Sequence, residues 1–98
     1  MFTISTSGAA SVKATYMGYP NITTGANIKI TIQKRFLFFW FDVDGGEWDD
    51  DLTGWNNSTT HSLDLTSTGS YRAVFEYTVY GSGGDPDEIE ETIYRDYD

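Results

Sequence analysis

Apolar and polar residues alternate with a period of two along several segments, as in a β-strand that buries one face. The clearest segment, Ser70 to Tyr80, is apolar on one parity throughout, at Tyr71, Ala73, Phe75, Tyr77 and Val79. Asn27 to Lys34 repeats the pattern with Ile28, Ile30 and Ile32, and Ser11 to Met17 repeats it with Val12, Ala14 and Tyr16. Apolar residues at helical spacing are missing, so the pattern predicts strands and almost no helix.

Three further segments complete the predicted strands. Thr59 to Leu65 places His61, Leu63 and Leu65 on one parity. Glu88 to Tyr97 alternates poorly and is heavily charged, which is typical of an edge strand. Phe36 to Asp44 is apolar on both parities, which predicts either a central strand covered on both sides or an exposed aromatic face.

Glycine-rich segments separate the strands and set the architecture. Gly18 to Ala26, Gly45–Gly46 and Gly81 to Asp87 have the composition of turns and loops. Six to seven short strands without intervening helices predict an all-β fold, a two-sheet antiparallel immunoglobulin-like sandwich. The 98 residues suffice for a single domain, residues 1–98, in which residues 1–9 are expected to form a flexible N-terminal segment.

The immunoglobulin-like assignment depends on the segment Leu65 to Ala73. A glycine before Tyr71 resembles the corner that precedes strand F of such domains, where a tyrosine ring joins the core and its hydroxyl bonds a nearby carbonyl. Ala73 then takes the position of the usual second cysteine. Ile30 and Trp40 are expected to take the positions of the first cysteine and of the strand C tryptophan.

Four stretches also resemble a group of uncharacterised small secreted all-β proteins of Gram-positive bacteria. They are Ile30–Lys34, Phe39–Trp48, Gly69–Val74 and Tyr77–Gly84. The resemblance implies export, so the protein is expected to be secreted or extracellular, although Met1 to Ser7 lacks the pattern of a signal peptide. It implies no activity, because the group has no catalytic motif to carry over.

Charge and composition exclude several function classes. The chain has 15 acidic and 6 basic side chains and a net charge of -9, so nucleic acid and anionic membranes are poor partners. The longest apolar run, Phe36 to Phe41, is too short to cross a bilayer, so no membrane insertion is expected. Without cysteine there is no disulfide, thiolate metal site or thiol nucleophile, and His61 is the single histidine.

An acidic cluster between Asp42 and Asp51 is the candidate metal site. Carboxylates that alternate and are followed by Gly-Gly can converge on calcium, and the first-choice ligands are Asp42, Asp44, Glu47 and Asp49. The spacing does not fit a helix-loop-helix calcium motif, and the alternative is a solvated acidic loop without a cofactor. No enzyme is expected, because a small sandwich offers little cleft and exposed carboxylates keep ordinary pKa values.

The aromatic residues provide the main functional indication. The chain has more aromatic residues than one small core needs, and the surplus comprises Trp40, Trp48 and Trp55 with Phe36, Phe38, Tyr16 and Tyr19. Exposed aromatic rings bind sugars or anchor protein partners. Trp48 and Trp55 fall in or beside the polar segment Gly45 to Ser58. In the alternative interpretation, Trp48 pairs with Trp40 across a hairpin and both close the core.

These observations predict a non-enzymatic binding or adhesion module that binds a protein or glycan through an aromatic and acidic loop, Asp42 to Ser58. A second hypothesis is a structural or filament-forming subunit that self-associates by donating the strand Phe2 to Thr6 to a neighbour. A third is a calcium-dependent carbohydrate-binding module in which Trp48 stacks on the sugar.

Overall fold

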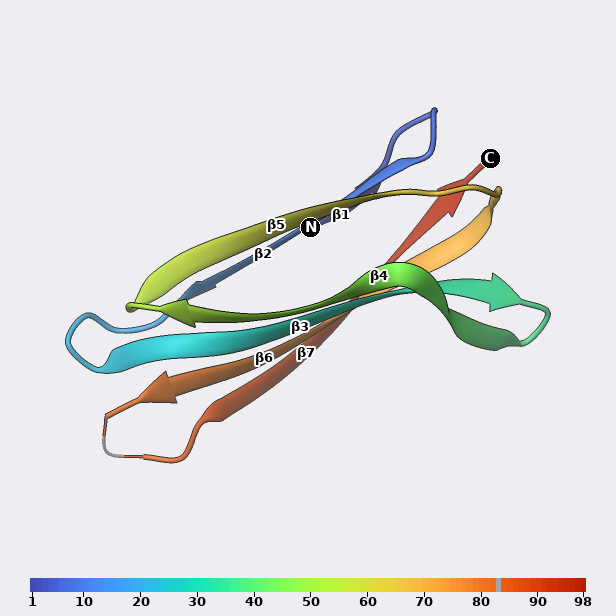
Figure 1. The fold of residues 1–98 in the computed structure, drawn as a ribbon. Helices are drawn as coiled ribbons and strands as arrows, with labels where there is room; N and C mark the ends of the chain where they lie inside the picture. The colour runs from blue at the N-terminus through green and yellow to red at the C-terminus, as the bar shows by residue number, and fades with distance from the viewer. Residues whose placement is uncertain (83) are drawn as a thin grey trace.

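Seven strands form two antiparallel sheets in the computed structural model, which describes residues 1–82 and 84–98 (Figure 1). They are β1 (Phe2–Ile4), β2 (Ala9–Met17), β3 (Thr23–Phe36), β4 (Phe39–Thr53), β5 (Asn56–Asp64), β6 (Gly69–Gly81) and β7 (Asp87–Tyr97). One sheet has the order β1-β2-β5 and the other β4-β3-β6-β7. The predicted two-sheet antiparallel sandwich is confirmed. Within the described ranges there is no helix capable of spanning a membrane.

The strand order matches an immunoglobulin-like sandwich whose sheets contain strands A-B-E and C′-C-F-G. β6 corresponds to strand F, and the predicted corner stands at its start. The Tyr71 side chain is buried, and its hydroxyl donates a 2.6 Å hydrogen bond to the Ser67 carbonyl oxygen, four residues upstream. This bond ties the β5–β6 connection to the core, and the prediction for Tyr71 is confirmed.

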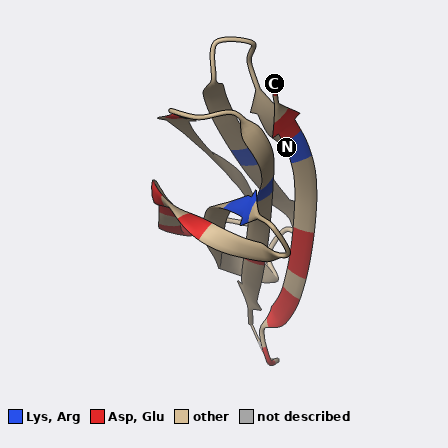
Figure 2. Cartoon of the chain, turned by 90° about the vertical axis from the view of Figure 1, so that its right-hand side faces the viewer, with Lys and Arg blue, Asp and Glu red and all other residues tan. Residues whose placement is uncertain are grey.

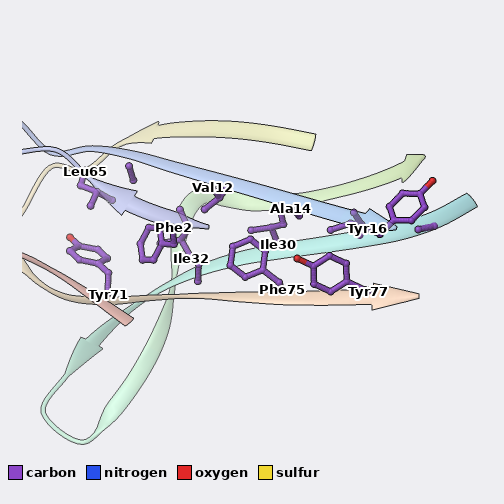
Figure 3. Packing of buried hydrophobic residues seen from close by; sticks show 14 residues of the cluster. Phe2, Val12, Ala14, Tyr16, Ile30, Ile32, Leu65, Tyr71, Phe75 and Tyr77 are labelled. Atoms are coloured by element: carbon purple, nitrogen blue, oxygen red, sulfur yellow. The ribbon is translucent and has the colours of Figure 1, made fainter. Parts of the chain in front are cut away.

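The core lies between the sheets and contains the side chains that the alternation predicted. β3 contributes Ile28, Ile30 and Ile32, all fully buried, and Phe75 of β6 lies beside Ile30. β2 covers them from the other sheet with Val12, Ala14 and Tyr16. Figure 3 shows Tyr71 and Leu65 at one end of this cluster and Tyr16 and Tyr77 at the other. Alternation therefore identified the buried face of β2, β3 and β6.

The predicted replacement of the Cys–Trp–Cys pin by Ile30, Trp40 and Ala73 is wrong. Ile30 lies on β3, in the same sheet as Ala73, whereas the two cysteines of an immunoglobulin domain join opposite sheets. The Trp40 ring packs on the outer face of the four-stranded sheet, against Arg72. The error arose because residues 1–9 were not counted as a strand, which shifted the strand assignment by one position.

The aromatic run predicted as a single strand, Phe36 to Asp44, contains a reversal of the chain. β3 ends at Phe36 and β4 begins at Phe39, and these two residues pair across a turn formed by Leu37 and Phe38. Of the two alternatives for this run, the exposed aromatic face is the one observed. Leu-Phe lacks the glycine, asparagine or proline that normally marks a turn, so composition did not reveal it.

The acidic segment after Gly45–Gly46 is a strand, and the predicted loop from Asp42 to Ser58 is therefore wrong. β4 continues to Thr53 because β3 is long enough to pair with it from Thr31 to Gly25. Its register shifts between Thr31 and Gln33, where four residues of β4 oppose Ile32 alone. Gly45 adopts a φ of 76° there, so the glycines form a bulge within the strand.

The N-terminal segment also belongs to the sandwich. Phe2 is fully buried and pairs with Val12 of β2, and the Met1 amino group donates a 2.6 Å hydrogen bond to the Lys13 carbonyl oxygen. The turn to β2 fits closely, because a Cβ on Gly8 would come within 2.9 Å of the Tyr97 ring. Residues 2–4 thus form an ordered first strand instead of the flexible segment expected. In the predicted β6–β7 loop, residue 83 lies outside the described residues.

Replacing Tyr71 by Phe tests the corner. We expect Tyr71→Phe to lower the free energy of unfolding by about 1 kcal/mol, because the Ser67 carbonyl loses its donor. Urea denaturation measures the change. Tyr80→Phe is the matched control, since Tyr80 is exposed and its hydroxyl makes no hydrogen bond to the described residues. Equal losses in both variants would contradict the assigned role of the Tyr71 hydroxyl.

Replacing Phe2 by Ala tests the first strand. We expect Phe2→Ala to cost about 3–5 kcal/mol of stability, because it leaves a cavity between the sheets. Thr3→Ala, at an exposed position of the same strand, should change stability by less than about 0.5 kcal/mol. Both values come from chemical denaturation. A small effect of Phe2→Ala would show that β1 is detached in solution.

Candidate functional site

The β3–β4 hairpin carries a cluster of exposed apolar side chains that we call the hairpin tip. Its members are Phe36 (64% exposed), Leu37 (68%), Phe38 (86%), Phe39 (64%) and Phe41 (54%). Contiguous apolar surface of this kind is uncommon on a monomer and marks an interaction site. The tip lies at one end of the sandwich, beyond the three-stranded sheet (Figure 1).

Unequal sheet lengths cause this exposure. The core-facing row of β3 contains the buried Ala26, Ile28, Ile30 and Ile32 and continues through the half-buried Lys34 to Phe36. Opposite that end of β3, β2 begins only at Ala9 and β5 ends at Asp64. Phe36 and the residue that pairs with it, Phe39, therefore extend the inner face past the edge of the facing sheet. They are core-type residues without a core to cover them.

Aromatic contacts within the tip hold its side chains in one arrangement. The Phe41 ring packs against Phe36 and against Phe39, with ring centroids 6.4 Å apart in both pairs. A hollow of about 410 Å³ lies beside Phe41, between the hairpin and the β5–β6 connection, and Lys34, Asp64, Leu65 and Tyr71 are among its lining residues. A partner side chain could enter this hollow while other groups contact the rings.

The turn itself carries backbone strain. Leu37 has a φ of 57°, in the left-handed region that glycine and asparagine normally occupy. A side chain such as leucine is disfavoured there by roughly 1–2 kcal/mol. The Arg35 Nε donates a 2.8 Å hydrogen bond to the Leu37 carbonyl oxygen, which helps to hold this conformation. The turn thus contains an apolar residue in a backbone conformation that lowers its stability. Strained positions of this kind are typical of functional sites.

Trp40 begins a polar and aromatic ladder on the outer face of the same sheet. The Arg72 guanidinium lies 4.5 Å from the centroid of the Trp40 ring, and Tyr94 contacts that ring edge-on at 5.7 Å. Arg72 Nε also donates to the Gln33 side-chain oxygen at 2.7 Å, and Gln33 in turn donates to Asp42 at 2.8 Å. Four strands contribute to this ladder, which stiffens the sheet behind the hairpin tip.

Trp48 faces the opposite side of the sheet and packs against the seam between β4 and β5. It lies opposite Ile30, and its ring stacks on the His61 ring with centroids 4.9 Å apart and planes 9° from parallel. The proposed pairing of Trp48 with Trp40 is therefore wrong. One face of the indole is already occupied by His61, so that face is not free to stack on a sugar.

His61 also contacts a carboxylate at this seam. The His61 Nε2 lies 2.5 Å from the Asp50 Oδ2, and the Thr59 hydroxyl donates to the same oxygen at 2.7 Å. The hydrogen bond with His61 holds the pKa of the Asp50 carboxyl below its ordinary value, and the Thr59 bond acts in the same direction against the effect of partial burial. His61 is half-buried, and this pair joins the two sheets.

The structure separates the remaining predicted binding residues. Trp55 lies in the turn between β4 and β5, at the end of the sandwich opposite the hairpin tip, and is 39% exposed (Figure 1). Trp40, Trp48 and Trp55 thus occupy an outer face, an inner seam and a distant turn. Tyr16, also counted among the surplus aromatics, is buried, and its hydroxyl donates to the Gly54 carbonyl oxygen.

The acidic residues of β4 point to different places. Asp42 accepts a hydrogen bond from Gln33. Asp44 lies in the bulge of β4, and Glu47 and Asp49 lie on the part of the strand that follows it. Asp49 and Asp51 are neighbours on the outer face, where the Asn27 amide donates to both, at 2.6 and 2.9 Å. Over residues 1–82 and 84–98, no group of three or more histidine or acidic side chains could hold a metal ion.

Charge is concentrated on the two outer strands of the four-stranded sheet. β4 carries six acidic residues and β7 five (Figure 2). By contrast, Lys34, Arg35, Arg72 and Arg95 lie toward the hairpin end, since Lys34 pairs with Tyr71 and Tyr71 with Arg95. The hairpin tip is therefore bordered by charges of both signs, because Asp42, Asp44 and Asp64 line the hollow beside Phe41 together with Lys34.

Sequence reasoning named Phe36 and Phe38 as surplus aromatics but placed the site further along the chain. The signal that would have located the tip is the parity of β3: extending the inward row from Ile32 leads to Phe36. Comparisons of the chain with protein-family models, with curated proteins and with solved structures found no match.

The Asp50–His61 contact predicts a specific pH dependence of stability. Because the folded pKa of Asp50 lies below the ordinary value of 3.8, the contribution is complete well above that value and is lost as the pH falls through the folded pKa. Asp50→Asn should therefore destabilise the protein more at about pH 6 than at about pH 3. Chemical denaturation at both pH values measures this. An equal effect of the exposed control Asp44→Asn would contradict the assignment.

Proposed function

We propose that this protein is a non-enzymatic binding module, acting outside the cell, that binds a partner protein through the hairpin tip. The observation that carries the proposal is the exposure of five neighbouring apolar side chains on one hairpin. Large aromatic side chains dominate the energetics of protein interfaces because they bury much apolar area with little loss of conformational freedom. The extracellular location rests on the sequence resemblance alone.

The chemistry of the tip favours a protein over a glycan. Sugar sites combine an exposed ring with polar groups that bond hydroxyls, whereas the most exposed part of the tip, Phe36 to Phe39, consists of apolar side chains alone. An apolar pocket of a protein is the complementary surface. The neighbouring Lys34 and Arg35 would pair with acidic residues around that pocket and would raise the association rate.

The partner surface is therefore expected to be concave, apolar at its centre and charged at its rim. Such an arrangement places the fully desolvated contacts at the centre and the charged contacts where water remains. Phe38, the most exposed member of the tip, is the expected anchor. The Trp40–Arg72 contact supports the hairpin from behind and would reduce the entropy lost on binding.

A double substitution in the turn should weaken binding without lowering the stability of the fold. The double variant Leu37→Gly, Phe38→Ser places glycine at the positive φ of residue 37 and removes two apolar side chains. Its free energy of unfolding should therefore equal that of the wild type or exceed it by up to about 1 kcal/mol. Binding should fall at least about tenfold, since the anchor is lost. A partner protein is first captured from extracellular fractions of candidate partner cells. Titration of the captured protein with the wild type and with the double variant then measures the two affinities.

Tyr19→Ser is the matched control, because Tyr19 is 72% exposed but lies in the β2–β3 connection, at the other end of the sandwich. It should retain binding. A partner that binds the double variant and the wild type equally would refute the role of the tip. Light scattering over a range of concentrations tests the assembly alternative, since a mass that rises with concentration would identify a second copy as the partner.

A further inference from the structure

The hollow beside Phe41 has walls from two separate parts of the chain. One wall is the beginning of β4, from Phe41 to Asp44, and the other is the connection from β5 to β6. Its volume of about 410 Å³ lies within the usual range of small-ligand sites, about 300–1,000 Å³. The hollow can therefore hold a large side chain of another protein. It reaches the hairpin tip, because Phe41 belongs to both.

The bulge in β4 borders the hollow at the end away from the tip. A Cβ on Gly46 would come within 3.1 Å of the Ile32 Cβ, so the strand lies closely on the core there. A Cβ on Gly45 or Gly46 would also lie 3.6 or 3.5 Å from a methyl group of Leu63 in β5. β4 and β5 therefore touch at the bulge, and the hollow begins where this contact ends.

The β5–β6 connection is held in place by its own contacts. The Tyr71 hydroxyl donates to the Ser67 carbonyl oxygen, and the Lys34 Nζ donates to the Ser67 hydroxyl at 2.5 Å. The Lys34 Nζ also lies 5.7 Å from the centroid of the Tyr71 ring. Leu65 and Tyr71 are buried together at one end of the core (Figure 3). This wall is thus fixed before a ligand binds, which reduces the entropy lost on binding.

The lining of the hollow carries more negative than positive charge. Asp42, Asp44 and Asp64 contribute carboxylates, and Lys34 is the one cation among the lining residues that the structure describes, which gives a net charge of -2. Over residues 1–82 and 84–98, the single ion pair lies elsewhere, at the seam between β4 and β5. None of the three aspartates is therefore paired with a cation. A cationic group is the complementary occupant.

The form of this surface favours arginine over lysine or a metal ion. Apolar surface lies beside the carboxylates, since Phe41 is 54% exposed and Val43 is half-buried. Arginine has a planar guanidinium that stacks on aromatic rings and bonds two carboxylate oxygens at once, whereas the lysine ammonium is compact and strongly hydrated. A metal ion needs ligands that converge on one point, and the described part of the chain contains no such group of acidic side chains.

We propose that the hollow beside Phe41 receives an arginine side chain of the partner protein. This rests on the proposed function, because the hollow adjoins the hairpin tip and the same partner would contact both. The methylene groups of the arginine pack against Phe41 and Val43, and its guanidinium faces the carboxylates of Asp44 and Asp64. The partner surface thus presents an arginine beside the apolar pocket that accepts Phe38.

Titration of the whole protein with N-acetyl-argininamide tests the site without the partner. We expect saturable shifts of the NMR amide signals of residues 41–44 and 64–67, at constant ionic strength. N-acetyl-citrullinamide has nearly the same shape but no charge, so it should bind at least about tenfold more weakly. N-acetyl-lysinamide should bind at least about threefold more weakly. Shifts spread over the whole acidic surface, or equal affinity of either analogue, would overturn the proposal.

A single carboxylate can be removed with little change of shape. Asp64→Asn should weaken binding of N-acetyl-argininamide at least about threefold. Asp85→Asn is the matched control, because it changes the net charge equally but lies in the β6–β7 connection, at the other end of the sandwich. It should retain the wild-type affinity. Equal losses in both variants would indicate attraction to the acidic protein as a whole and would overturn the proposal. The melting temperatures of both variants verify that the fold is intact.

Titration with the captured partner separates this proposal from the proposed function. Asp64→Asn should weaken that binding at least about threefold relative to Asp85→Asn. If the double variant of the turn loses binding and Asp64→Asn does not, the tip binds a protein without using the hollow, and the arginine proposal alone is overturned. If Asp64→Asn loses binding and the double variant does not, the role of the tip is refuted and the arginine site is supported.

Discussion

The unequal length of the two sheets is the constraint on which the rest of this structure depends. β3 forms the middle of the long sheet, pairs with β4 and β6, and supplies the buried row Ile28, Ile30 and Ile32. The facing sheet covers this row but does not reach Phe36 at the end of β3. Core-type residues at the hairpin end therefore become the tip.

The distribution of charge follows from the same geometry. The outer strands of the long sheet, β4 and β7, are the edges at which two copies could pair, and they carry most of the acidic residues. Like charges on an edge repel a second edge and protect against aggregation.

Local alternation was sufficient to predict the strands that have one buried and one exposed face. β2, β3, β6 and the edge position of β7 follow from it, and the glycine before Tyr71 predicted the corner. Alternation failed at β4 for two physical reasons. The bulge around Gly45 shifts the parity of the strand, and the carboxylates after it resemble a loop because nothing local shows that Asn27 bonds two of them. Long-range pairing with β3 overrides both signals.

The turn at Leu37 and Phe38 was missed for a different reason. Sequence rules for turns describe residues that stabilise them, and this turn contains a leucine with positive φ and a phenylalanine that is almost fully exposed. In β2, β3 and β6, local preference and overall fold agree, because branched and aromatic residues occupy the buried parity. Sequences tend to depart from such consistency where a residue is kept for a contact made outside the folded chain. The departure at the tip coincides with Phe38, the most exposed large hydrophobic residue among those that the structure describes. Strain and exposure, which are independent properties, therefore indicate the same surface.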